Sequence, residues 1–497
     1  MKNRIGQYKY LLNSLVLAFS SFFYMPVFSQ SHSGLITGNY IGINHLQVNP
    51  ANICFQPLAV DINLISLDGN LNNNNFYSEP TFLLTRPFNN NFNKLVPQNK
   101  GFKSDAVKDE DLIVKKNLQP NGYIFGGVYA MGPSVLFSLS KKKSIAFTTG
   151  FRTHLGITQI SDLTANTIFE GLTFSDVIFQ KMKLNDTKVS FASWAEAGIS
   201  YAQVIKENNN YMHRLGFSVK ALIGISGAYI YDRGFNGDNE NGKDLIFNNS
   251  SFSYAYSGPV TKNINATNTQ NQIKPRGFGG GFDIGYSIEK KNYSSARYCP
   301  KMYGFSTVSV DYKWKAGISL LDIGAIKFTQ NAFFTEINNG GMRWRGFDTL
   351  LNTDVAEIDA IFRSNVVGTT PVTANNFWLI LPSAVSLQFD YRVVTEFFLN
   401  ITIFQRLTLA QMPSLSRMNT LVFAPRYDSE TWTLSIPFVL NEYKNPTIGI
   451  AYRYKYVTIG SDRIAETMGI QQAFGVDFYA SLKYYIGHNS SKWRKLF

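Results

Sequence analysis

The chain of 497 residues has few charges and, beyond its N-terminus, no long apolar segment. A membrane-spanning helix needs about 20 consecutive apolar residues. Asp, Glu, Lys and Arg together make up only 16% of the chain, whereas an ordinary soluble domain has roughly 25%. Aromatic residues are abundant at 15%, with 40 Phe and 27 Tyr. This composition is typical of a transmembrane β-sheet, in which only every second side chain of a strand faces lipid.

Cysteine is also rare, because only Cys54 and Cys299 are present. Two distant thiols do not make a disulfide framework, and whether they pair stays open. The net charge is +13, but the basic residues fall in short runs such as 141–143 and 290–291. Nucleic-acid modules gather such residues in one patch. We therefore expect no nucleic-acid partner and assign the runs to turns near lipid head groups.

Motifs for catalysis or metal binding are missing as well. The five histidines form no His-x-x-x-His pair, and there is no Gly-x-Ser-x-Gly sequence. The glycine stretch Gly277–Gly281 lies within an alternating strand pattern, with no helix after it to bind a nucleotide phosphate. Asp238–Gly242 lacks the terminal Glu of a calcium loop. The sequence therefore predicts no enzyme, no cofactor and no metal site.

The N-terminus has the organisation of a secretory signal peptide, residues 1–29. Lys2, Arg4 and Lys9 precede an apolar stretch that ends at Phe28 and Ser29. A basic region, an apolar region and a small residue at the cut define such a signal. We expect Gln30 to begin the mature chain, which then crosses the inner membrane.

Alternation of apolar and polar residues dominates the mature chain. It places alternate side chains on opposite faces of a strand. The alternating segments run about ten residues, which is enough to cross a bilayer at a barrel's tilt. The clearest examples are 215–226, 278–288, 385–392, 448–456 and 476–486.

The strand pattern predicts an all-β fold, a closed antiparallel transmembrane β-barrel of about 14 strands, over residues 57–487. Short linkers alternate with long polar ones, as outer-membrane barrels require. The long ones are Asp68–Asn117, Ser161–Ser190 and Asp232–Lys274. A basic tail, 488–497, follows the barrel.

One stretch, 329–382, fits this scheme poorly. The strand count puts it at the periplasmic side, where connections should be short. Either a strand is miscounted or a plug-like insertion lies here. Within the stretch, Thr353–Phe362 has the periodicity of a short helix.

The N-terminal part of the mature chain carries a family resemblance. Asn49, Pro50 and Ala51 are followed by Asp61-Ile62-Asn63, Leu321-Asp322-Ile323-Gly324 and Gly460-Ser461-Asp462. In this order the motifs resemble an uncharacterised Bacteroidota outer-membrane family. That family is distantly similar to the superfamily of long-chain fatty-acid transporters and type IX secretion shuttle proteins. The chain lacks the hydrophobic, Gly-rich N-terminal pattern of true fatty-acid transporters.

The resemblance implies that residues 30–56 fold into the lumen as a hatch. A simple Asx-Pro turn into the first strand is the alternative, and both stay open. The hatch candidates are Asn49, Pro50, Ala51 and Asn52.

Charged residues on the polar faces are candidates for the lumen lining, where they either pair across the barrel or line a solute path. They are Lys220, Asp283, Asp311, Lys313, Asp390, Arg392, Arg453, Asp477 and Lys483.

The sequence thus predicts a protein of the bacterial outer membrane, in contact with lipid and lipopolysaccharide. The first function hypothesis is a passive transporter or channel for a small or amphipathic solute. The second is a non-transporting scaffold or shuttle component with a protein partner at the cell surface or in the periplasm. The fold does not distinguish these hypotheses, so the residues and geometry of a functional site are needed to decide between them.

Overall fold

The computed structural model of the chain describes most of the mature sequence. The described residues are 34, 36, 38–54, 58–78, 114–117, 119, 121–140, 142–162, 164–165, 181–184, 187–239, 244–258, 274–292, 312–344, 355–408 and 412–487. The predicted signal peptide, the basic tail, Cys299 and Asp311 lie outside them.

Strands make up most of the described chain, and all but two of them belong to one antiparallel sheet. The elements of the first half are η1 (Gly42–Gln47), η2 (Pro50–Ile53), β1 (Leu58–Asn73), β2 (Phe76–Ser78), β3 (Val114–Lys116), β4 (Gly122–Met131), β5 (Ser134–Ser140), β6 (Lys143–Ile160), β7 (Lys181–Leu184), β8 (Lys188–Glu207), β9 (Tyr211–Asp232), β10 (Phe235–Asn239), β11 (Leu245–Ser257) and β12 (Gly277–Lys291). Those of the second half are β13 (Tyr312–Phe328), β14 (Ala332–Trp344), α4 (Val355–Ser364), β15 (Val366–Val367), β16 (Val372–Ala374), β17 (Phe377–Ile380), β18 (Ala384–Val394), β19 (Phe397–Arg406), β20 (Thr420–Asp428), β21 (Trp432–Ser435), β22 (Phe438–Asn441), β23 (Asn445–Ile448), β24 (Ile450–Tyr454), β25 (Val457–Ser461), α5 (Ile464–Thr467) and β26 (Gly475–Gly487).

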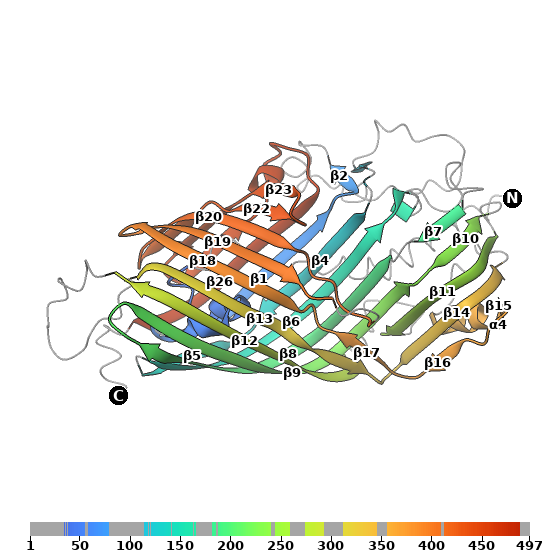
Figure 1. Ribbon diagram of the computed structural model, residues 1–497, viewed down its shortest axis with the longest axis horizontal. Helices are drawn as coiled ribbons and strands as arrows, with labels where there is room; N and C mark the ends of the chain where they lie inside the picture. The colour runs from blue at the N-terminus through green and yellow to red at the C-terminus, as the bar shows by residue number, and fades with distance from the viewer. Residues whose placement is uncertain are drawn as a thin grey trace, which may run out of the picture.

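The sheet closes into a barrel of 14 wall positions, as predicted (Figure 1). Several positions hold two or more segments end to end: β4 with β5, β7 with β8, β9 with β10, β11 with β12, β13 with β14, β15 to β18, β21 with β22, and β23 with β24. The other six are β1, β6, β19, β20, β25 and β26. Pairing of β1 with β26, from Leu58↔Gly487 to Asn72↔Gly475, completes the ring.

The two faces of the wall are sorted by polarity. On β9, the exposed side chains of Leu215, Phe217 and Val219 alternate with the buried Gly216 and Ser218. The same holds around the ring, where apolar side chains face outward and buried polar side chains face inward. In a soluble sandwich the apolar rows would instead pack against each other. The predicted alternation is therefore confirmed, and it belongs to a barrel with an apolar exterior.

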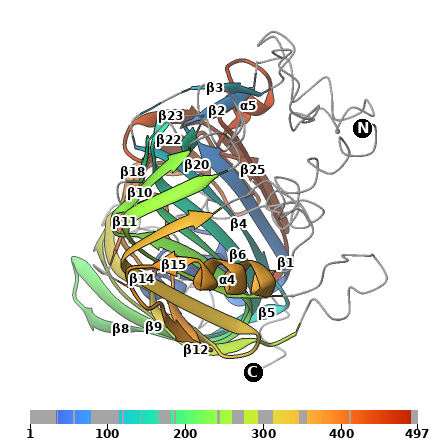
Figure 2. The same cartoon turned by 90° about the vertical axis from the view of Figure 1, so that its right-hand side faces the viewer.

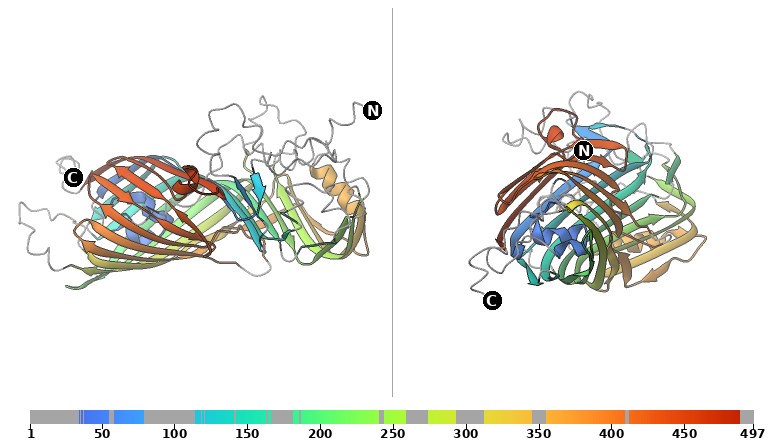
Figure 3. Two further views of the ribbon diagram at one scale, coloured as in Figure 1. Left: turned by 90° about the horizontal axis from the view of Figure 1, so that it is seen from above. Right: turned by 60° about the vertical axis from the view of Figure 1, so that its left-hand side comes forward.

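The wall is much taller on one side. At the end that holds Leu58 and Gly487 the hairpins are short, as at Ser140–Lys143. At the opposite end, β7, β10, β11, β14, β15 and β16 continue the wall beyond its other strands (Figures 1 and 3).

Helix α4 lies against this taller wall beside β14 and β15 (Figure 2). The Asp359 carboxylate accepts hydrogen bonds from the Tyr254 hydroxyl at 2.6 Å and the Thr335 hydroxyl at 3.0 Å. Phe362 packs against Phe247 and Phe252. The predicted short helix is confirmed, with bounds shifted by two residues. No helix of the described chain is long and apolar enough to cross a bilayer.

The predicted position of 329–382 was wrong. The described part of the stretch lies at the end opposite Leu58 and Gly487, because β14 continues β13 in the same direction and pairs with β11. The predicted loop Asp232–Lys274 contains β11 for the same reason. Both errors come from strands that run beyond one membrane crossing.

Residues 38–54 lie inside the ring, and we call them the inward segment (Figures 1 and 3). Asn49 combines the two alternatives of the sequence analysis. Its side chain caps η2 by accepting from the Ala51 N–H at 2.9 Å, with Pro50 at the first helical position. The same turn is buried in the lumen, since Asn49 and Ala51 are 0% exposed.

Glycines on two neighbouring strands make room for this turn. A Cβ on Gly216 of β9 would lie 2.5 Å from the backbone of Pro50 and Ala51. A Cβ on Gly285 of β12 would lie 2.1 Å from Asn49 Oδ1. The backbone of η2 can approach the wall only because these positions carry no side chain.

We predict that Gly216→Ala displaces the inward segment, because the new Cβ overlaps backbone atoms that cannot rotate away. The buried Cys54 thiol should then react faster with a maleimide in a Cys299→Ala background. Gly280→Ala is the matched control, since its Cβ would meet nothing closer than 3.7 Å. Equal labelling rates in the two variants would contradict the predicted fit.

Candidate functional site

A cavity of about 60 Å³ lies in the lumen, with room for a few water molecules. We call it the lumen chamber. Its lining is amphipathic, since aromatic and aliphatic side chains alternate with charged ones. The lining comes from the inward segment with its preceding residue Ile36, from the seven wall strands β1, β4, β6, β9, β13, β19 and β20, and from the chain between β19 and β20. It comprises Ile36, Leu46, Gln47, Asp68, Asn70, Phe125, Gly126, Tyr129, Arg152, His154, Lys220, Leu321, Asp322, Phe404, Arg417, Met418 and Thr420.

Residues 412–419, between β19 and β20, fold into the lumen, and we call them the inward connection. The Ile380 N–H donates to the Pro413 carbonyl at 3.1 Å, and the Leu415 N–H donates to the Ile380 carbonyl at 2.9 Å. His154 contacts the Ser416 carbonyl through Nε2 at 2.9 Å. The inward connection thus covers the chamber on the side away from the inward segment.

An apolar cluster holds the inward connection in place. Leu415 is buried together with Phe328, Phe377 and Trp194. The rings of Phe328 and Phe377 stack with their centroids 5.1 Å apart. The Phe328 ring fills space left by Gly224 and Gly227, where a Cβ would approach it within 3.0 Å. At this height the lumen is packed with apolar side chains.

Next to the cluster, toward the end of the barrel that holds Leu58 and Gly487, an ion-pair network centres on Asp322. Arg152 Nη1 contacts both Asp322 oxygens, at 3.0 and 3.1 Å, and Lys220 Nζ contacts one of them at 2.7 Å. Lys220 also pairs with Asp283 at 2.7 Å, and Arg152 pairs with Glu196 at 3.1 Å. Buried charges require such partners, because removal from water costs several kcal/mol per ion.

A β-bulge aims Asp322 at this network. Two residues of β13, Leu321 and Asp322, stand opposite Asp283 of β12. Asp322 has φ of 54°, a left-handed conformation that is uncommon outside glycine. The Asp283 carboxylate accepts the Asp322 N–H at 2.7 Å, and the Ser383 hydroxyl donates to the Asp322 carbonyl at 2.7 Å. The Leu-Asp-Ile-Gly motif is thus a bulge that turns a carboxylate into the lumen.

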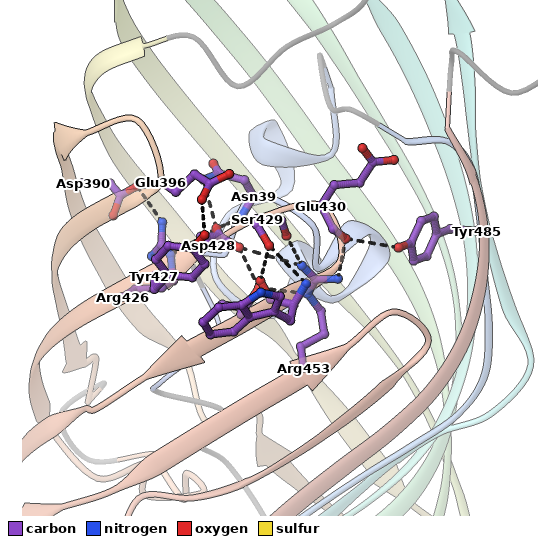
Figure 4. A network of polar contacts seen from close by, with 12 residues as sticks. Asn39, Asp390, Glu396, Arg426, Tyr427, Asp428, Ser429, Glu430, Arg453 and Tyr485 are labelled. Carbon is purple, nitrogen blue, oxygen red and sulfur yellow. Dashed lines mark hydrogen bonds and ion pairs between the residues drawn. The ribbon is translucent and has the colours of Figure 1, made fainter.

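A second network fastens the start of the inward segment (Figure 4). Arg426 is fully buried and pairs with Asp390 at 3.0 Å and with Asp428 at 3.1 Å. Asp428 in turn accepts from the Asn39 backbone N–H at 2.8 Å. Arg453 donates to the carbonyls of Ser429 and Glu430, at 2.5 and 3.1 Å, in the β20–β21 hairpin.

The rest of the inward segment is fastened along its length. Asp61 accepts from the Ile43 N–H at 2.7 Å and pairs with Lys483 at 2.8 Å. Further on, Asn49 Nδ2 donates to Gln388 Oε1 at 2.9 Å, and Arg214 Nη1 donates to the Cys54 carbonyl at 3.1 Å. Wall side chains therefore satisfy several polar groups that the inward segment would otherwise bury unpaired.

A smaller cavity of about 20 Å³ lies near the end of the barrel that holds Leu58 and Gly487. We call it the lower cavity. It shares Ile36 and Gln47 with the lumen chamber. The remaining lining residues are Tyr40, Ile41, Asn44, Arg453, Lys455, Thr458, Lys483 and Tyr485. Ile36 and Gln47 therefore belong to the walls of both cavities.

Of the predicted lumen-facing residues, six are enclosed in the lumen. Asp283, Asp390, Arg453, Asp477 and Lys483 are at most 7% exposed, and the Lys220 side chain is 12% exposed. Arg392 is half-buried in the β18–β19 hairpin, where its Nε donates to the Thr395 carbonyl at 3.1 Å. Asp311 lies outside the described residues.

The prediction for Lys313 was wrong, because its side chain is exposed and Lys315 is buried instead. The register of β12 against β13 shifts here, since Lys290 is opposite Trp314 while Lys291 is opposite Tyr312. The extra residue reverses the alternation, as a bulge does.

Several residues that contribute to the lumen in the same way were not among the predicted ones. Arg152, Glu196 and Arg426 lie on inward faces of strands whose alternation is visible in the sequence. Asp322 was quoted only as part of a motif. Gln47 and Arg417 come from segments with no strand pattern, so no sequence signal placed them.

No group of three or more His, Cys, Asp or Glu in the described chain could hold a metal ion.

Comparison with solved structures finds outer-membrane barrels. A Pseudomonas aeruginosa FadL homologue is 9% identical, with a TM-score of 0.40, covering 93% of this chain and 98% of that one. A TodX monoaromatic hydrocarbon channel with the deltaS2S3 mutation is 8% identical, with a TM-score of 0.39 and coverage of 93% and 96%. The Ralstonia pickettii toluene transporter TbuX is 10% identical, with a TM-score of 0.33 and coverage of 90% and 94%.

No curated protein shows a significant sequence match. A protein family matches over residues 50–462, from the capped turn of the inward segment to the Gly-Ser-Asp motif before the last strand. The chain therefore belongs to the family described as "Family of unknown function (DUF5723)".

Proposed function

We propose that the protein is a passive channel of the bacterial outer membrane for small amphipathic solutes. The observation that carries this proposal is the pair of cavities in the lumen that share Ile36 and Gln47 as lining residues. A barrel that served only as a rigid support would need no space on both sides of a lumen segment.

The cavities define a route along the barrel axis. A solute would pass the inward connection, enter the lumen chamber, and reach the lower cavity past Ile36 and Gln47. Aromatic side chains such as Phe125 and Phe404 face the chamber together with Arg152 and Lys220. A lining of this kind suits a solute with an apolar body and a polar group. Movement of the two inward parts of the chain would open the route.

The exterior supports placement in a lipid bilayer, with lipid and lipopolysaccharide as its surroundings. Exposed apolar side chains cover the wall, and aromatic pairs such as Tyr427 with Trp432 lie near one end of the strands. Amphipathic rings prefer the head-group level. Lys142 and Lys291 lie at the same end as Leu58, beside Glu207.

A scaffold role is the second candidate, and the taller wall favours it. The sheet of β10, β11 and β14, braced by α4, extends the wall beyond its shorter strands. Such a platform would suit a protein partner. Solute uptake separates the two functions, because a scaffold needs none.

We predict that Val219→Arg destabilises the folded barrel in lipid vesicles by about 2–4 kcal/mol, the cost of a cation on the lipid face near the midplane. The matched control is Val394→Arg at a hairpin end, where the cost falls to about 0–1 kcal/mol. Val219 is 55% exposed and Val394 is 63% exposed. Urea unfolding from vesicles measures both, and equal small effects would contradict a lipid-facing wall.

We predict that vesicles containing the protein take up small solutes that empty vesicles exclude. The panel would include sugars, amino acids and aromatic sulfonates. A lack of difference for every solute class would rule out the channel.

The route predicts that a disulfide between the inward connection and the wall slows this uptake. A Cβ on Gly156 would lie 3.1 Å from Ser416 Cβ and 2.8 Å from the Ser416 carbonyl oxygen. The inward connection must therefore shift by a few tenths of an ångström to reach the roughly 3.5–4.5 Å between the Cβ atoms of a disulfide. Gly156→Cys with Ser416→Cys, in a background with Cys54→Ala and Cys299→Ala, should lose uptake on oxidation and regain it with dithiothreitol. Each single cysteine variant is a control. Full uptake in the oxidised double variant would place the route elsewhere.

A further inference from the structure

Arg417 differs from the other arginines of the lumen. Arg152, Arg214, Arg426, Arg453 and Arg463 each have a carboxylate oxygen within 4.0 Å. In the described part of the chain, no carboxylate lies within that distance of the Arg417 guanidinium. Its nearest defined contact is the Phe404 ring, whose centroid is 4.5 Å from Cζ. A cation on an aromatic face is stabilised but keeps its N–H donors available.

A second unpaired donor faces the same chamber. Gln47 Nε2 is buried and has no hydrogen-bond partner among the described residues. Gln47 belongs to the inward segment and Arg417 to the inward connection, so the donors come from the two parts that close the route. A buried donor without an acceptor costs free energy unless a bound molecule supplies one.

The carboxylates nearby already have partners. Both oxygens of Asp322 are occupied by Arg152 and Lys220, and Glu196 accepts from Arg152 and Trp194. Asp283 accepts from Lys220 and from the Asp322 N–H. Their geometry directs them at each other, which leaves the donors of Arg417 and Gln47, together with His154 Nδ1, as the open positions of the lining.

We propose that the lumen chamber binds a small organic anion, a carboxylate or sulfonate with a compact apolar body. Arg417 and Gln47 donate to its charged group. The charged group fits the chamber of about 60 Å³, and a body the size of a benzene ring needs the inward connection to move before it can pack against Leu46, Phe125 and Met418. The inference rests on the proposed function, because the chamber must be reachable by solute. It names the class of solute that the channel selects.

The binding test uses the purified full-length protein in detergent with benzenesulfonate, by isothermal titration calorimetry. The cation benzyltrimethylammonium has a similar body and opposite charge. The wild type should bind the sulfonate and not the cation. Arg417→Gln should weaken sulfonate binding about tenfold or more, as expected for loss of a hydrogen bond to a charged group. Arg417→Lys should retain part of the affinity.

Gln47→Glu gives an isosteric second variant, which replaces a donor by a negative charge. It should also weaken sulfonate binding and allow the cation to bind. Lys444→Gln is the matched control, because it removes an exposed cation in the β22–β23 turn and should change nothing. Circular dichroism verifies that each variant is folded. Absence of sulfonate binding by the wild type, or equal affinity in Arg417→Gln, would overturn the inference.

Uptake into vesicles separates this inference from the proposed function. If no solute enters while Arg417-dependent binding persists, the proposed channel function is wrong and the proposed anion site stands. If benzenesulfonate and benzyltrimethylammonium enter at equal rates and Arg417→Gln changes neither rate, the proposed anion site is wrong and the proposed channel function stands.

Discussion

Closure of the sheet is the constraint on which the rest of the structure depends. In lipid, every backbone N–H and C=O must find a partner within the protein, so an open sheet edge is not tolerated. The pairing of β1 with β26 removes both edges. Once the ring is closed, the period of two along each strand divides side chains between an outside and an inside. The outside is apolar here, and the inside collects the polar groups.

The polar inside creates a second requirement, because charges brought together in the lumen must pair with one another. Networks around Asp322 and Arg426 meet it by linking residues far apart in sequence. The inward segment extends the same principle to backbone groups, since Asp61, Asp428 and Gln388 bind residues 39–49 directly. What remains between these fixed contacts is a small amphipathic chamber, and the donors of Arg417 and Gln47 face it without a protein partner among the described residues.

Much of the wall could be predicted because alternation is a local property of the sequence. The faces of 215–226 and 476–486 follow from it directly. Bulges could not be predicted, since they depend on the partner strand: Lys313 was assigned to the wrong face and Asp322 was overlooked for this reason. The taller wall was misassigned because β13 and β14 together exceed one crossing. Gln47 and Arg417 belong to irregular segments whose position depends on tertiary contacts with glycines and apolar side chains of the wall.

The central claim, that alternate wall residues contact lipid while their neighbours face a polar lumen, is tested most directly by spin labels placed singly along β9 from 215 to 224. In lipid vesicles, collision rates with molecular oxygen should rise at 215, 217, 219 and 223 and fall at 218, 220 and 222. Gly216 and Gly224 stay unlabelled, because a side chain there would meet Pro50 and Phe328. A water-soluble nickel reagent should not reach the first set. Collision rates without a period of two, or free access of the nickel reagent to Leu215, Phe217 and Val219, would contradict the account.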